Sequence, residues 1–219
     1  MIRVMLVDDQ ELLRAGFRMV LGAQPDIDVV AEAADGVAAL EVLRTTEVDV
    51  VLMDVRMPRM DGVEATALID GPKVLILTTF DLDEYAFSAL KAGASGFLLK
   101  DVPAADLVSA IRSVHAGDAV VAPSTTRRMI ARFASMMPSA PTGEPPGAAP
   151  LTTREREVML MVARGLSNTE IAEHLDLAEA TVKTHLGRVL AKLGLRDRAQ
   201  VVVYAYERRL IIPSDRPKG

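Results

Sequence analysis

The stretch VDVVLMDVRMPRMDG, residues 48–62, decides how the first half of the chain is interpreted. It opens with Val48–Met53, a mostly apolar run typical of a parallel strand that helices cover on both faces. Asp54 follows directly, and the Met57-Pro58 and Asp61-Gly62 pairs indicate turns. The stretch therefore predicts a buried strand that delivers a carboxylate to a loop.

Four similar runs surround this strand, and amphipathic helical patterns separate them. Leu13, Phe17 and Val20 have the helical spacing i, i+4, i+7. Strands that alternate with helices predict a doubly wound α/β domain with a five-stranded parallel sheet over residues 1–121. The other predicted strands are Val4–Val7, Val29–Ala33, Val74–Thr78 and Gly96–Leu99.

Polar residues end or follow four of the five strands, where the working site of such a sheet lies. They are Asp8, Asp9, Asp54, Thr78 and Lys100. Three close carboxylates repel one another unless a hard cation such as Mg²⁺ sits among them. A carboxylate can also attack phosphorus and form an acyl phosphate. Each residue alone is more often a helix cap or turn residue, but all five at one edge favour phosphoryl chemistry.

The overall composition excludes several classes of site. The 219 residues include no Cys and only three His, which excludes disulfide scaffolds, thiolate metal sites and Cys nucleophiles. No apolar run approaches the ~20 residues of a membrane span. The N-terminal segment reaches Asp8 and Asp9 at once, unlike a signal peptide, so we expect a cytoplasmic protein without membrane contact.

The net charge of −5 conceals a division of the chain. Residues 1–121 hold 20 acidic and 10 basic side chains, whereas residues 151–219 hold 9 and 12. Between them, five of the 13 residues from Pro138 to Pro150 are proline, as in an extended linker. We expect two domains, 1–121 and 151–219, joined by a linker over 122–150 that is Pro-rich from 138. Residues 123–137 are either a linker helix or a plain tether.

The basic part has the spacing of a helix-turn-helix within a small all-α, four-helix domain. Thr152 or Thr153 and Ser167 are predicted helix N-caps, and Asp176-Leu177 the turn. Polar residues outside the apolar stripe of the following helix suit the major groove, although a solvated face is the alternative. These residues are Thr181, Lys183, Thr184, Arg188 and Lys192.

Residues 1–121 resemble the receiver domain of two-component response regulators. The resemblance implies that a sensor histidine kinase phosphorylates Asp54. It also implies that Mg²⁺ is held by Asp8, Asp9, Asp54 and the backbone carbonyl of Arg56. The matching stretches are Val7-Asp8-Asp9, residues 51–58, Asp61-Gly62, Leu77-Thr78-Thr79 and residues 92–100.

The same resemblance assigns two further roles and shows one departure. Thr78 and Phe97 would form a switch pair, in which the hydroxyl moves toward the phosphoryl group and the ring follows inward. A core aromatic is the alternative for Phe97. Many receivers have Pro directly after the lysine, whereas Asp101 follows Lys100 here.

Residues 151–212 resemble the LuxR-type DNA-binding domain, and the two parts together resemble the NarL/FixJ subfamily. The resemblance implies that Lys183 and Thr184 approach base edges and that the final helix, 198–209, contributes to dimerisation. His185 is expected to pack or to contact phosphate. The matching stretches are residues 151–158, 165–172, 181–186 and 192–193.

These observations predict a phosphorylation-gated transcriptional regulator and not an enzyme. Phosphorylation of Asp54 would promote a homodimer that binds double-stranded operator DNA. One alternative is an Asp-nucleophile phosphatase, which needs a second Asp two residues after its nucleophile; Arg56 and Gln10 stand at that spacing. Another is a constitutive DNA binder whose receiver only docks partners.

Overall fold

The computed structural model describes residues 1–78, 88–117, 151–208 and 210–211. The chain divides into two compact units, Met1–Val120 and Val121–Gly219. The predicted linker over 122–150, with its Pro-rich part and the segment 123–137, lies outside the described residues.

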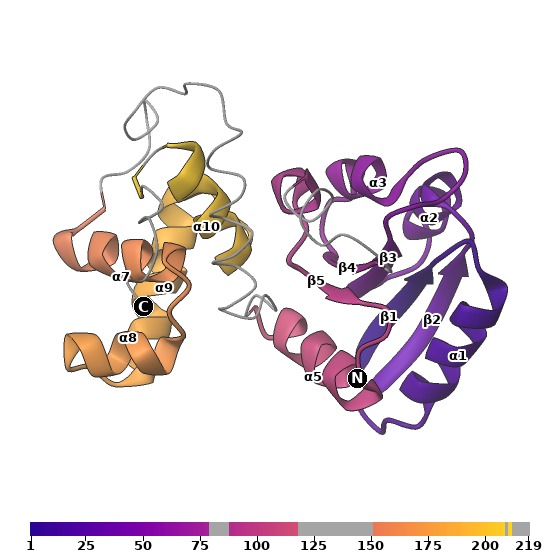
Figure 1. The fold of residues 1–219 in the computed structure, drawn as a ribbon, viewed down its shortest axis with the longest axis horizontal. Helices are drawn as coiled ribbons and strands as arrows, with labels where there is room; N and C mark the ends of the chain where they lie inside the picture. The colour runs from indigo at the N-terminus through magenta and orange to yellow at the C-terminus, as the bar shows by residue number, and fades with distance from the viewer. Residues whose placement is uncertain (79–87, 118–150, 209, 212–219) are drawn as a thin grey trace, which may run out of the picture. The chain divides into compact units, whose positions relative to one another are not determined.

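The first unit is built on a five-stranded sheet in the order β2-β1-β3-β4-β5, with every neighbouring pair parallel (Figure 1). The predicted α/β fold is confirmed, and the strand ends differ from the predicted ones by at most two residues. β1 and β3 are central neighbours, which places their carboxyl ends side by side. The strands are β1 (Ile2–Val7), β2 (Ile27–Ala33), β3 (Val50–Asp54), β4 (Lys73–Thr78) and β5 (Gly96–Leu99).

Helices cover the sheet because the strands are apolar on both faces. α1 (Glu11–Gly22) and α5 (Ala104–His115) pack their apolar stripes against one core cluster, through residues such as Leu21 and Ile111. α2 (Gly36–Leu43) and α3 (Gly62–Leu68) lie next to each other away from that cluster (Figure 1). The carboxyl edge of the sheet stays open to the loops that follow each strand.

The second unit is all-α in its described part, as predicted. Thr152 and Ser167 cap α7 and α8 through capping boxes with Glu155 and Glu170, which settles the first cap as Thr152. Asp176 has a positive φ of 53° and forms the turn between α8 and α9. The helices are α7 (Thr153–Ala163), α8 (Asn168–Leu175), α9 (Glu179–Leu193) and α10 (Arg198–Glu207).

The apolar faces of these helices enclose a small core that contains Met159, Ile171 and Val182. Across the part of the chain that the structure describes, no helix combines the length and hydropathy needed to cross a bilayer.

Candidate functional site

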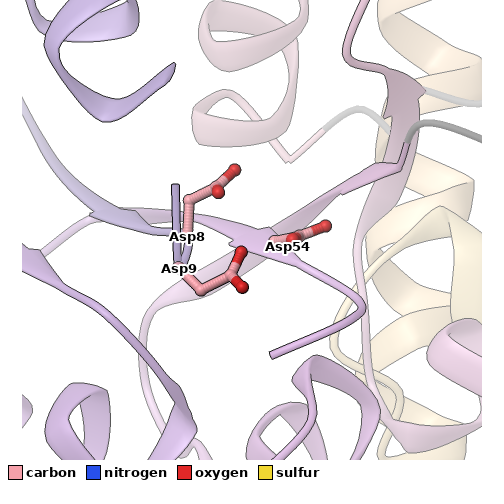
Figure 2. A group of neighbouring side chains, drawn as sticks. All are labelled: Asp8, Asp9 and Asp54. Atoms are coloured by element: carbon pink, nitrogen blue, oxygen red, sulfur yellow. The ribbon is translucent and has the colours of Figure 1, made fainter. Parts of the chain in front are cut away.

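The carboxyl edge of the sheet brings the predicted acidic residues together. Asp8 follows β1 and Asp54 ends β3, and these strands are neighbours, so the two carboxylates lie side by side (Figure 2). One carboxylate oxygen from each of Asp8, Asp9 and Asp54 lies within 4.8 Å of the others. Asp8 and Asp54 are buried, whereas Asp9 is exposed and gives the cluster a side open to solvent.

Lys100 supplies the positive charge of this cluster. Its Nζ lies 2.6 Å from Asp8 Oδ2 and 3.0 Å from Asp54 Oδ2, and its side chain is only 4% exposed. The Lys100 amide donates to the Thr78 carbonyl at 2.8 Å, which continues the β4–β5 ladder to the site. Lys100 reaches both acids although Asp101, and not Pro, follows it.

Burial and charge act in opposite directions on Asp54. Burial raises the pKa of the Asp54 carboxyl above its ordinary value, and the charge of Asp8 adds to this. The hydrogen bond and charge of Lys100 and the amide of Val55 act the other way. The carboxylate of Asp54 therefore depends on nearby positive charge, which is the setting that a phosphoryl-transfer site needs.

The acidic cluster fits Mg²⁺ by its donor chemistry. It offers carboxylate oxygens only, which hard divalent cations prefer. Asp8 Oδ1 accepts a hydrogen bond from the Gln10 amide at 2.9 Å. Asp8 Oδ2 is buried and pairs by charge with Lys100 at 2.6 Å, so this oxygen already lies beside a cationic group. Receiver domains generally bind Mg²⁺ at such an acidic pocket.

The other predicted receiver residues lie in the loop after β3 and on the neighbouring strands β4 and β5. Arg56 lies in the loop after β3, two residues beyond Asp54, with its side chain exposed. Thr78 ends β4, and Phe97 lies on β5, opposite Ile76; both side chains are buried. Since Ile76 and Thr78 are two residues apart on one strand, Thr78 and Phe97 lie on the same face of the sheet. This arrangement suits both a switch pair and a plain core aromatic.

One contact at the site was not predicted from the sequence. Arg14 of α1 donates from Nη1 to the Asp8 carbonyl at 2.6 Å, and its Nε lies 3.3 Å from Glu32 of β2. The guanidinium thus fixes the backbone that carries the acidic pair. In the sequence Arg14 is one polar position of an amphipathic helix, and nothing there identifies its distant partners.

The outer face of α9 carries the residues predicted to contact DNA. Lys183, Thr184 and Arg188 are exposed, and Thr181 is partly exposed. Thr184 donates its hydroxyl to the Ala180 carbonyl of the same helix at 2.9 Å, which leaves its oxygen able to accept a hydrogen bond.

Two residues of α9 have roles inside the domain. The Nζ of Lys192 lies 2.7 Å from the buried carboxylate of Glu155 on α7, so this predicted DNA contact is also a structural ion pair. His185 is partly buried, and its buried Nδ1 has no hydrogen-bond partner, as expected of a packing residue. In the sequence Glu155 is recognisable only as an acidic residue in the first turn of a helix, and its pairing with Lys192 was not predicted.

Comparisons with known families match both parts of the chain. Residues 4–112 match the response regulator receiver domain, and residues 149–205 match the bacterial regulatory proteins of the luxR family. The uncharacterized transcriptional regulatory protein YxjL of Bacillus subtilis is 42% identical over 214 residues, which cover 96% of this chain and 97% of the relative. Response regulator protein VraR of Staphylococcus aureus is 41% identical, covering 96% and 99%.

A solved structure supports the same assignment. A LuxR-family two-component response regulator from Aurantimonas is 39% identical, with a TM-score of 0.55 over 58% of this chain and 94% of that one. The relatives are regulators, which favours neither the phosphatase nor the constitutive binder. The chain therefore belongs to the response regulators of the NarL/LuxR type, transcriptional regulators of two-component systems that join a receiver domain to a LuxR-type DNA-binding domain.

Proposed function

We propose that Asp54 is the phosphoacceptor and that its phosphorylation by a sensor histidine kinase controls DNA binding. The observation that carries this proposal is the buried Lys100 ammonium, which lies within 3.0 Å of carboxylate oxygens of both Asp8 and Asp54. A buried cation between two buried acids is typical of a functional site that stabilises negative charge.

The proposed reaction is an in-line displacement at phosphorus. An Asp54 carboxylate oxygen attacks the phosphoryl group on the kinase histidine, the N–P bond breaks, and an O–P bond forms an acyl phosphate. Lys100 neutralises charge on the transferred group, and the Thr78 hydroxyl donates to one of its oxygens. Asp8, Asp9, Asp54 and the Arg56 carbonyl would hold Mg²⁺, which supplies further positive charge when bound.

The proposed output joins the two units. Movement of Thr78 toward the phosphoryl group draws Phe97 inward and changes the receiver surface in favour of a homodimer. Two linked DNA-binding units then bind two half-sites at a raised effective concentration. Lys183 and Thr184 approach base edges, and α10 contributes to the dimer. The protein acts in the cytoplasm. The remaining proposed DNA contacts are Thr181, Arg188 and Lys192.

The phosphoacceptor is tested by intact-mass measurement after incubation with acetyl phosphate and Mg²⁺. We expect one phosphoryl group on the full chain and none on Asp54→Asn. Asp101→Asn is the control, because Asp101 is exposed and lies outside the carboxylate cluster. Phosphorylation of Asp54→Asn at the rate of the unmodified chain would contradict the assignment.

A further inference from the structure

The loop that follows Asp54 is attached to the end of β2 by an ion pair. Nε of Arg59 donates to Asp35 Oδ2 at 2.8 Å, and Nη2 of the same guanidinium binds the same oxygen. Asp35 is only 3% exposed, whereas Arg59 lies largely in solvent. The exposed arginine therefore reaches back from the β3–α3 loop to a carboxylate buried beside α2.

The backbone of this loop is strained and packs closely against the first residue of α2. Arg59 has a φ of 66°, which a side chain with a Cβ disfavours. The Met60 carbonyl accepts from the Gly36 amide at 3.2 Å. A Cβ on Gly36 would lie 2.8 Å from Met60 Cγ, so the first residue of α2 and the β3–α3 loop touch without room for a side chain. Such a backbone persists when its surroundings hold it in place.

Each carboxylate oxygen of Asp35 binds a different partner. Oδ1 accepts from the Ala38 amide at 3.1 Å and caps α2, while Oδ2 receives Arg59. Burial alone would raise the pKa of Asp35, but the Ala38 amide and Arg59 outweigh it and hold the pKa below its ordinary value. The cap explains why an acid stands here, and the arginine ties that acid to the β3–α3 loop.

We propose that the Arg59–Asp35 pair is a positioning device that fixes the β3–α3 loop, and with it the Arg56 carbonyl, for cation binding beside Asp54. Arg59 is three residues from Arg56, and the Gly62 amide closes the loop on the Val55 carbonyl at 2.9 Å. The inference rests on the proposed function, because it assigns the Arg56 carbonyl to the Mg²⁺ site. Residues that orient metal ligands contribute to affinity without touching the metal.

The other end of β2 supplies a matched control. Arg112 of α5 donates to Asp26 from Nε at 2.7 Å and from Nη2 at 2.6 Å, just before β2 begins. This is again an Arg–Asp pair on the same unit, but it lies at the opposite edge of the sheet from the cluster of Asp8, Asp9 and Asp54. A purely structural ion pair predicts the same consequences for both arginines.

The test compares full-length Arg59→Asn, Asp35→Asn and Arg112→Gln with the unmodified chain. Asn tolerates a positive φ at residue 59 and retains a capping oxygen at residue 35, so both variants remove the pair with little other change. Isothermal calorimetry measures Mg²⁺ binding, and the rate of phosphorylation by acetyl phosphate is followed against Mg²⁺ concentration. Thermal unfolding checks each fold.

We expect Mg²⁺ affinity to fall roughly tenfold in both pair variants, and the half-saturating Mg²⁺ concentration for phosphorylation to rise by the same factor. The rate at saturating Mg²⁺ should approach that of the unmodified chain, and Arg59→Lys should recover part of the loss. Arg112→Gln should bind Mg²⁺ normally.

Normal Mg²⁺ affinity in Arg59→Asn and Asp35→Asn, or an equal loss in Arg112→Gln, would overturn the positioning role. A failure of the proposed function has a different signature, because the unmodified chain would then accept no phosphoryl group. Calorimetry would still decide the role of the pair in that case.

Discussion

Lys100 is the residue on which the proposed phosphorylation site depends most. Its ammonium lies between Asp8 and Asp54 and is almost fully buried. Replacement by Met removes the positive charge and leaves two buried carboxylates to repel each other. We expect the phosphorylation rate with acetyl phosphate to fall about 10²–10³-fold, the usual loss on removal of one group that stabilises transition-state charge.

The control for this substitution is Lys91→Met, since Lys91 is exposed within the short helical stretch 88–92 that precedes β5. It should retain the rate of the unmodified chain. If Lys100→Met were phosphorylated as fast as Lys91→Met, charge stabilisation by Lys100 would have to be abandoned.

Glu155 is the residue through which we expect the DNA-binding unit to be sensitive to acid. Lys192 and the Thr152 amide bind its ionised form and lower its pKa from 4.5 to about 2. A depressed pKa stabilises the fold above the unfolded value, and this contribution is lost as the pH falls from about 4.5 toward 2. Glu155→Gln keeps a capping-box side chain but removes the charge.

We therefore expect Glu155→Gln to speed hydrogen exchange of the α7 and α9 amides at pH 7. The difference from the unmodified chain should shrink as the pH falls below 4.5, the ordinary value for this carboxyl. Glu157→Gln is the matched control, because Glu157 pairs with Arg154 on the solvent-exposed part of the same helix. A pH-independent difference for Glu155→Gln would argue against the ion pair.

At the scale of elements, the sequence predicted what depends on local pattern. The strands were recognisable because apolar side chains fill both of their faces, and the meeting of Asp8 with Asp54 followed from the common edge of parallel strands. β1 and β2 begin at Ile2 and Ile27, two residues earlier than predicted. The prediction started late because polar residues such as Arg3 interrupt the apolar pattern there.

Contacts between distant residues are what the sequence pattern did not contain. Arg14 and Arg59 looked like ordinary polar positions, and their partners Glu32 and Asp35 lie 18 and 24 residues away. The same holds for Lys192, which was correctly placed outside the apolar stripe, but whose partner in α7 is 37 residues distant. A single sequence gives the polarity of a position and not the group that it meets.

The turn between α8 and α9 sets the path into the proposed recognition helix. Asp176 adopts the left-handed conformation there, and the Leu177 amide donates to the Ala172 carbonyl at 2.9 Å. Asp176→Val should reduce the free energy of unfolding by about 1–2 kcal/mol, because a β-branched residue disfavours positive φ. Asp176→Asn should be close to neutral. Urea unfolding followed by helical circular dichroism measures both, and equal midpoints would contradict the strained turn.

At the scale of the whole molecule, the charge of −5 divides into two different surfaces. The acidic receiver unit gathers three carboxylates, two of which pair with the buried Lys100, and the basic unit exposes Lys183 and Arg188 on α9. The excess of basic residues in the second unit is small, so one copy gains little affinity from phosphate contacts. Pairing of two copies is the route by which the receiver would control DNA binding.

Phosphorylation of Asp54 is proposed to raise DNA affinity through dimerisation. The most direct measurement is the affinity of the full chain for its operator, selected from random DNA, at fixed salt with and without acetyl phosphate and Mg²⁺. We predict tighter binding on phosphorylation, together with a shift from monomer to dimer in sedimentation, and neither change in Asp54→Asn. Equal affinity and equal mass for phosphorylated and unphosphorylated protein would contradict the claim.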